Sequence, residues 1–179
     1  QIPRRVAFIQ CVGSRTLRDG KPYCSNVCCM NTVKDALLIK EHWPEVEIFV
    51  LYTDLRAFGK GFEALLKRSR EEGVTYIRGK PSKIEELENG NLVIHAEDTL
   101  LGEPIELEAD MVILSVGLVP RKDSDLVQRL FSLSRTEDGF FLEAHPKLRP
   151  VDTAVGGVFL AGTCEGPKDI KESVTQASA

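Results

Sequence analysis

The chain has 179 residues, 42% of them hydrophobic and 28% charged, so a packed core is feasible and wholesale disorder is not expected. Lys and Arg number 23 against 27 Asp and Glu, a net charge of −4 that argues against a general nucleic-acid binder. The apolar runs are far shorter than the ~20 residues that span a bilayer. No secretory signal opens the chain, so we expect a cytoplasmic protein without a membrane span.

The first part of the chain is predicted to alternate strands and helices. Apolar periodicity gives, in order, a strand (residues 4–10), a helix (26–42), a strand (47–52), a helix (58–72) and a strand (74–77). Ser25 or Asn26 is expected to cap the first helix, and Gly73 to end the second. The polar residues 16–23 are expected to form a surface excursion between the first strand and the first helix.

The next segment predicts an antiparallel meander followed by a buried strand. Residues 84–87 and 91–96 flank Asn89-Gly90, a strong hairpin signal, and residues 103–108 alternate like a further strand. Residues 109–117 form an apolar run that ends in Gly, which is typical of a central parallel strand. The order predicts an α/β fold, a three-layer doubly wound nucleotide-binding domain of the FAD/NAD type with a β-meander crossover.

The character of the sequence changes after Pro120. Two short strands are predicted at residues 138–142 and 157–162, within Pro- and Gly-rich surroundings. We therefore expect a domain that covers residues 1–119 and a partial second domain that covers residues 120–179. Because the chain does not begin with Met and ends within a predicted helix, we expect an excerpt of a longer protein.

Four of the five cysteines lie close together in the sequence, at Cys11, Cys24, Cys28 and Cys29. An odd count without a signal peptide argues against a secreted disulfide framework, and neighbouring cysteines rarely bridge one another. Thiolates from a loop and a helix start suit an iron–sulfur cluster or another metal. Zinc sites usually need a second, separated Cys pair, which this chain lacks. From spacing alone, an iron–sulfur cluster, zinc, redox thiols and buried structural cysteines remain open.

The cysteine loop occupies the position at which related folds bind a phosphate. In a dinucleotide-binding domain, a Gly-rich turn after the first strand leads into a helix whose N-terminus holds a pyrophosphate. Here the G-x-G-x-x-G pattern is absent, and thiolates stand at a helix start that favours an anion. Two residues stay ambiguous: Lys34 is a candidate site residue or a surface lysine that pairs with Asp35, and Cys164 is by default a buried or loop cysteine.

Residues 153–162 resemble the second FAD-contact motif of flavoprotein reductases with two dinucleotide domains. The shared features are Thr153, the run Gly157-Val158-Phe159 and the pair Ala161-Gly162. In that family the strand ends at a small residue so that the backbone approaches the flavin, and the next helix points its N-terminus at the flavin ring. An Asp usually follows the Ala-Gly pair, whereas this chain has Thr163 and Cys164.

Together, four motifs resemble the A-type subunits of heterodisulfide reductase, the flavin and iron–sulfur family of methanogens. They are Cys11-Val12-Gly13-Ser14-Arg15, Tyr23-Cys24-Ser25-Asn26-Val27-Cys28-Cys29-Met30, Arg56-Ala57-Phe58-Gly59-Lys60-Gly61 and Pro167-Lys168-Asp169-Ile170. The resemblance extends over essentially the whole chain. It implies a fold similar to thioredoxin reductase, with an NAD-like domain at residues 1–119 that carries a 4Fe–4S cluster, and the C-terminal portion of an FAD-binding domain at residues 120–179.

The resemblance also implies roles for individual residues. The cluster ligands would be Cys11, Cys24, Cys28 and Cys29. Lys34 would lie close to the flavin ring, where a cation tunes its potential or supplies a proton. The residues that line FAD in the full-length protein would be Gly162, Thr163, Gly166, Pro167, Lys168, Asp169 and Ile170.

The function implied is electron transfer within an oxidoreductase of methanogenesis. In the family, FAD splits an electron pair between acceptors of different potential, and the partners are the other heterodisulfide reductase subunits and an electron-donor protein. Because the first half of an FAD domain is missing from this sequence, we expect the fragment to bind FAD poorly and to be inactive alone. The alternatives are a zinc-stabilised non-catalytic module and a plain NAD(P)H-flavin reductase domain, which the missing glycine pattern disfavours.

Overall fold

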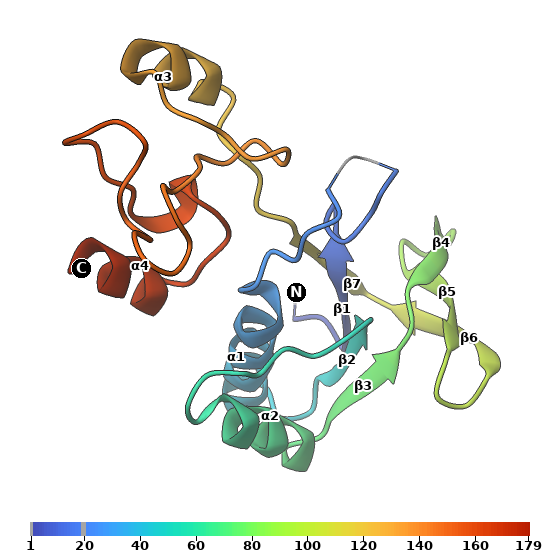
Figure 1. The fold of residues 1–179 in the computed structure, drawn as a ribbon. Helices are drawn as coiled ribbons and strands as arrows, with labels where there is room; N and C mark the ends of the chain where they lie inside the picture. Colours follow the sequence, from blue (N-terminus) through green and yellow to red (C-terminus); the bar gives the residue numbers. More distant parts are fainter. Residues whose placement is uncertain (1, 19–20) are drawn as a thin grey trace. The chain divides into compact units, whose positions relative to one another are not determined.

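A computed structural model describes residues 2–18 and 21–179 of the chain (Figure 1). The chain divides into two compact units. The first contains the chain up to Val12 and Cys28–Val116, and the second contains Gly13–Val27 and Gly117–Ala179. The second junction falls close to the predicted boundary after residue 119. The assignment of the two parts to an NAD-like and an FAD domain stays a prediction.

The first unit is built on a parallel four-stranded sheet with the order β3-β2-β1-β7. Its elements are β1 (Arg5–Val12), α1 (Cys28–His42), β2 (Glu47–Tyr52), α2 (Phe62–Glu71), β3 (Val74–Arg78) and β7 (Met111–Val116). At the centre, Phe8 of β1 pairs with Val50 of β2 on one side and with Ile113 of β7 on the other. The predicted α/β class with a parallel sheet is confirmed.

A second, antiparallel sheet forms the predicted meander. Its order β4-β5-β6 follows the chain, with β4 (Pro81–Glu86), β5 (Leu92–Asp98) and β6 (Glu103–Ala109). Between β4 and β5 the turn contains Asn89-Gly90, and Gly90 has a φ of +85°, a conformation that glycine adopts without strain. The Asn-Gly hairpin signal is confirmed.

Side chains on the two faces of the parallel sheet enter different clusters. Val6 and Phe8 of β1 pack with Ala36 of α1. Ala7 and Ile9, which alternate with them, pack with Ile94 of the meander. A strand turns successive side chains to opposite faces, so helix, sheet and meander form three layers, as predicted for the first unit.

Some details of the first unit differ from the sequence-based expectations. The apolar strand β7 was expected at the centre of a sheet, but it is the last strand in the order, and Leu114 and Val116 are 50% and 64% exposed. The helix expected from residue 58 begins at Phe62, because Gly61 takes a φ of +85° as its N-cap. α1 begins at Cys28 and not at residue 26, because Asn26 has a left-handed φ of +65°, which an α-helix does not accommodate.

The second unit has little regular structure. It contains α3 (Ser124–Phe131), the short 3-10 helix η1 (Gly162–Cys164) and α4 (Ile170–Ala177). The prediction of two strands at residues 138–142 and 157–162 was wrong: among the described residues these segments make only isolated bridges, Arg135 with Phe141 and Asp152 with Phe159. No described strand runs beside either segment to extend the bridge into a ladder. A small cluster of Leu133, Phe141 and Leu160 forms the core of this unit.

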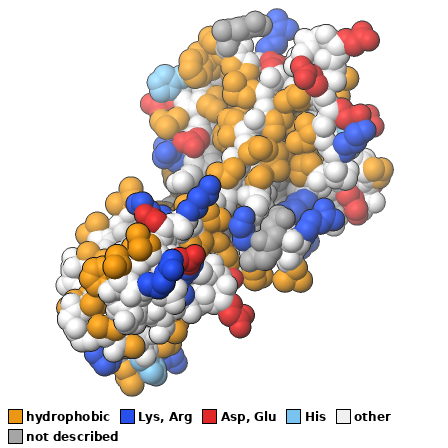
Figure 2. All heavy atoms as spheres, turned by 90° about the horizontal axis from the view of Figure 1, so that it is seen from above, with side chains coloured by type: hydrophobic (Ala, Val, Ile, Leu, Met, Phe, Trp, Pro, Cys, Tyr) orange, Lys and Arg blue, Asp and Glu red, His pale blue; other side chains and the backbone are white. Residues whose placement is uncertain are grey.

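Hydrophobic side chains remain visible between charged ones at the surface (Figure 2). None of the helices in the described part of the chain is both long and apolar enough to cross a membrane.

The predicted surface excursion at residues 16–23 is closed by a bridge between Thr16 and Lys21, and its residues 19 and 20 lie outside the described part.

Candidate functional site

Cys11 lies at a distortion near the end of β1. Pairing with β7 runs from Ile9 to Val12 on one strand but only from Leu114 to Val116 on the other, so β1 contains one extra residue, a β-bulge. Cys11 sits in this bulge with a left-handed φ of +58°, and its side chain is buried. A non-glycine residue in this conformation costs about 1–2 kcal/mol. Such strain persists where the surrounding structure enforces it, often at functional sites.

Cys28 and Cys29 form the first turn of α1, and both are buried. The thiol of Cys29 donates to the backbone carbonyl of Asp54 at 3.6 Å. The first backbone N–H groups of a helix have no partner within the helix, and they give this end a partial positive charge. The first turn of α1 contains no acidic residue. This helix end therefore favours an anionic group, such as thiolates bound to a metal.

Cys24 belongs to the second unit, four residues before the start of the first unit's helix at Cys28. Its sulfur accepts a hydrogen bond from the backbone N–H of Asn26 at 3.3 Å. The buried Ser25 accepts from the N–H of Leu118 at 2.8 Å, and the Tyr23 hydroxyl donates to the carbonyl of Leu118 at 3.0 Å. The segment that carries Cys24 is thus tied to residue 118 on both sides of the cysteine.

Backbone strain concentrates between Cys11 and Asn26, in the part of the chain that leads from β1 to α1. Of the four non-glycine residues with positive φ in the described part, three are Cys11, Arg15 and Asn26. All five cysteines carry thiols. Among residues 2–18 and 21–179, no three Cys, His, Asp or Glu side chains are grouped closely enough to hold a metal ion. The buried thiols, the strained bulge and the acid-free helix start fit an iron–sulfur group chemically, and the ligand assignment stays a prediction.

Lys34 lies on the exposed side of α1. Its side chain is 61% exposed, and its ammonium group pairs with the carboxylate of Asp35 at 3.0 Å. This is the surface pairing that the sequence left open as the alternative for Lys34. The role beside a flavin stays a prediction.

The segment predicted to contact FAD forms η1 and the start of α4 in the second unit. Gly162 has a φ of +77°, and its N–H donates to the side-chain oxygen of Gln176 at 2.8 Å. Asp169 caps α4 in a capping box: its carboxylate accepts from the N–H of Glu172 at 2.6 Å, and Glu172 accepts from the N–H of Asp169 at 2.9 Å. The chain here is well ordered by local hydrogen bonds.

Lys168 is largely buried, and its ammonium group has its partners within the second unit. It pairs with Glu165 and donates to the side chain of Gln176 at 2.8 Å, while Gln176 donates to Glu165 at 3.0 Å. Ile170 is 83% exposed. Cys164 is also exposed, on η1, where its thiol donates to the carbonyl of Ala161 at 3.2 Å, so the interpretation as a buried cysteine was wrong and the loop interpretation fits better.

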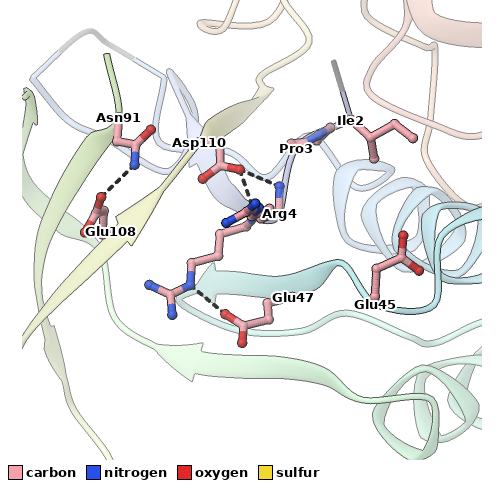
Figure 3. A pocket seen from close by; sticks show the side chains of 9 residues that line it. Ile2, Pro3, Arg4, Glu45, Glu47, Asn91, Glu108 and Asp110 are labelled. Atoms are coloured by element: carbon pink, nitrogen blue, oxygen red, sulfur yellow. Dashed lines mark hydrogen bonds and ion pairs between the residues drawn. The ribbon is translucent and has the colours of Figure 1, made fainter. Parts of the chain in front are cut away.

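A polar cavity of about 590 Å³ lies at the other end of the first unit, where β1 and β2 begin (Figure 3). In its lining, Arg5 forms an ion pair with Glu47 at 2.6 Å, and the side-chain amide of Asn91 donates to the carboxylate of Glu108 at 2.6 Å. The carboxylate of Asp110 accepts from the backbone N–H of Arg4. Neighbouring Glu47 also raises the pKa of Arg5, mainly through their hydrogen bond. None of the predicted site residues lines this cavity.

Sequence reasoning missed a buried polar group next to the cysteines. Gln10 directly precedes Cys11 and is only 1% exposed. The available signal was a polar residue at the end of the apolar run Val6-Ala7-Phe8-Ile9, where a buried strand usually continues with an apolar side chain.

Known proteins similar to this chain include heterodisulfide reductases of methanogens. No family model matches the chain. It is 58% identical to the second A-type iron-sulfur subunit of CoB–CoM heterodisulfide reductase from Methanopyrus kandleri. It is 55% identical to the A-type subunit of H(2):CoB-CoM heterodisulfide,ferredoxin reductase from Methanothermobacter thermautotrophicus. This chain is a homologue of one segment of these A-type subunits. The matches cover 99% and 98% of this chain but only 27% of each relative, so the chain spans about a quarter of their length.

Solved structures show the same fold at low sequence identity. Thioredoxin reductase of T. acidophilum superposes with a TM-score of 0.56 at 16% identity, and that of Lactococcus lactis with 0.58 at 19%. The alignments cover 96% and 97% of this chain and 48% of each reductase. The predicted fold likeness to thioredoxin reductase and the predicted resemblance to the heterodisulfide reductase family are both confirmed.

Proposed function

We propose that this chain is the electron-transfer segment of a heterodisulfide reductase-type oxidoreductase, in which Cys11, Cys24, Cys28 and Cys29 hold a 4Fe–4S cluster. The observation that supports the proposal most is the buried Cys11. It lies in a β-bulge with a left-handed backbone conformation, in the same unit as the buried Cys28 and Cys29. The names of the relatives agree with it, because they describe an iron-sulfur subunit of an oxidoreductase.

The chain's own groups create a setting for an anionic cluster. The bulge in β1 turns the backbone at Cys11 away from regular strand geometry. Buried cysteines at the helix start keep water from the metal, and the N-terminal amides of α1 stabilise negative charge. When bound, such a cluster takes up and releases single electrons.

The FAD of the full-length protein is proposed to contact the second unit. The residues assigned to this contact are Gly162, Thr163, Gly166, Pro167, Lys168, Asp169 and Ile170. The start of α4 carries the partial positive charge of a helix N-terminus, which favours an anionic group, and the partly buried pair of Lys168 with Glu165 fixes the connecting loop. Lys34 is proposed to act near the flavin, as a cation that tunes its potential or supplies a proton.

The proposed partners are the other heterodisulfide reductase subunits and an electron-donor protein. This rests on the names of relatives, among them the A-type subunit of a ferredoxin/F(420)H(2)-dependent CoB-CoM heterodisulfide reductase from Methanosarcina acetivorans. A role in methanogenesis in the cytoplasm is part of the same proposal. Splitting of electron pairs at FAD is proposed for the whole enzyme, with the remainder of the polypeptide and its partners present, and not for this chain alone.

The test is metal analysis of the chain after anaerobic purification and reconstitution. We expect about four iron and four sulfide per chain, and an electron paramagnetic resonance signal after reduction. Colourless protein with one zinc per chain would contradict the proposal and support the zinc-stabilised module. Iron-free, zinc-free protein that is reduced by NADH after addition of FAD would support the plain reductase domain.

A further inference from the structure

Three polar side chains, of which Gln10 and Thr32 are buried, join β1, α1 and β7 in the first unit. The amide nitrogen of Gln10, at the end of β1, donates to the hydroxyl of Thr32 on α1 at 2.6 Å and to that of Ser115 on β7 at 3.0 Å. The two hydroxyls lie 3.0 Å apart and are also hydrogen-bonded. Gln10 continues the face of β1 that carries Val6 and Phe8, which packs against α1.

This network leaves one strong polar atom without a partner. The side-chain oxygen of Gln10 is buried and makes no hydrogen bond within residues 2–18 and 21–179. A buried polar atom in this state is costly, and native structures rarely keep one without a reason. If the amide turns over, its oxygen accepts from the hydroxyl of Thr32 or of Ser115, while the other hydroxyl donates across the bond between the two. The amide NH₂ then occupies the open position and requires an acceptor.

Helix geometry places Cys28 and Cys29 on the same side of α1 as Thr32, the hydrogen-bond partner of Gln10. Thr32 follows Cys28 by four residues and Cys29 by three, so all three share one face of the first turns of α1, and all three are buried. Side chains of a helix lean toward its N-terminus, which brings Thr32 toward the cysteine turn. Gln10 is bonded to Thr32 and is joined covalently to Cys11. The sulfur atoms of these cysteines, or of a cluster that they bind, are therefore candidate acceptors for the amide.

We propose that Gln10 is a positioning residue for the proposed cluster: anchored by Thr32 and Ser115, its amide donates an N–H···S hydrogen bond to a cluster or ligand sulfur. Such a bond stabilises the reduced, more negative form and raises the reduction potential. The inference rests on the proposed function. Thr32 and Ser115 hold the amide in place without touching the cluster.

The variants Gln10→Met and Gln10→Glu test it in the anaerobically reconstituted chain. Gln10→Met keeps a similar volume but removes the donor, and Gln10→Glu keeps the shape but replaces the NH₂ with an acceptor. We expect both to retain iron and sulfide and to shift the midpoint potential, followed by paramagnetic resonance, to more negative values, with the larger shift in Gln10→Glu. A potential equal to that of the unchanged chain, at full cluster content, overturns the inference.

A matched control separates a redox effect from lost stability. Ser69→Ala removes a different buried hydroxyl of the same unit, which bonds to Leu66 and Tyr76 on and near α2. We expect this variant to lower the temperature of unfolding and to leave the potential unchanged. Equal potential shifts in Ser69→Ala and Gln10→Met would overturn the inference, because they would mark a general effect of destabilisation.

A measurement on the unchanged chain covers the case in which a Gln10 variant fails to fold. In protein with isotope-labelled glutamine side-chain nitrogen, we expect a hyperfine coupling from that nitrogen to the reduced cluster. Absence of the coupling overturns the role of Gln10 while the proposed function stands. If the unchanged chain holds no iron and sulfide at all, the proposed function fails first, before any comparison of variants.

Discussion

The two units of this chain place their candidate residues in opposite kinds of surroundings. In the first, Cys11, Cys28 and Cys29 lie on a strand and a helix around a core with members such as Phe8 and Val50. In the second, the segment around Gly162 to Ile170 has no sheet of described residues to support it and is held by side-chain hydrogen bonds. The first unit thus orders its candidate residues by the packing of a core, whereas the second holds the residues proposed to contact FAD by local hydrogen bonds.

The largest difference between the two units is expected when one cysteine is removed from each. Cys28→Ser is expected to abolish cluster assembly or to lower iron and sulfide content severely, because serine oxygen is a poor ligand for this site. Cys164→Ser, which changes the exposed cysteine of the second unit, is expected to keep full content. The measurement is the iron and sulfide content of each variant, and an unchanged content in Cys28→Ser would contradict the assignment of Cys28 as a ligand.

Substitutions in the two hydrophobic cores test whether each unit has its own stability. Phe8→Ala in the first unit is expected to cost about 3–5 kcal/mol, and Leu160→Ala in the small cluster of the second about 2–5 kcal/mol. Because the two residues belong to separate clusters, hydrogen exchange should report each loss in its own unit. Equal loss of protection in both units for either variant would show that the cores do not behave separately.

Removal of the cap of α4 is a smaller change confined to the second unit. Asp169→Ala loses the acceptor for the N–H of Glu172 and is expected to cost about 0.5–2 kcal/mol, seen as faster amide exchange in α4. Asp169→Asn retains an oxygen acceptor and serves as the control. If Asp169→Ala leaves exchange in α4 unchanged, the capping box does not stabilise this helix.

The smallest expected effect is a loss of folding stability in alkaline solution that depends on Tyr76. Burial raises the pKa of Tyr76, although its hydrogen bond with Ser69 opposes the shift. The stability gained from a raised folded-state pKa is complete below the ordinary tyrosine value of about 10 and is lost as the pH rises through the folded-state value. Unfolding followed across this range should show a steeper loss for the unchanged chain than for Tyr76→Phe. Parallel curves for the two proteins would contradict the burial argument.

Much of the first unit could be predicted because its signals are local. The apolar run before Gln10 and the turn at Asn89-Gly90 specify a strand and a hairpin within a few residues. The place of β7 at the end of the sheet could not be predicted, because strand order depends on pairings far apart in the sequence: Phe8 pairs with Ile113. The strands expected in the second unit failed for the related reason that a local pattern does not reveal whether a neighbouring strand exists.

The candidate site was predictable in composition but not in geometry. Cysteine spacing and family resemblance singled out Cys11, yet neither shows that its backbone is left-handed within a bulge. The network of Gln10 with Thr32 and Ser115 joins residues 22 and 105 positions away from Gln10, so only the folded chain brings them together.

X-ray absorption at the iron edge of the anaerobically reconstituted chain tests the central idea most directly. We predict a nearest shell made only of sulfur and a second shell of neighbouring iron atoms, as a cluster held by four thiolates requires. A shell of nitrogen or oxygen without neighbouring iron, or a metal edge that belongs to zinc alone, would contradict the assignment of Cys11, Cys24, Cys28 and Cys29 as cluster ligands.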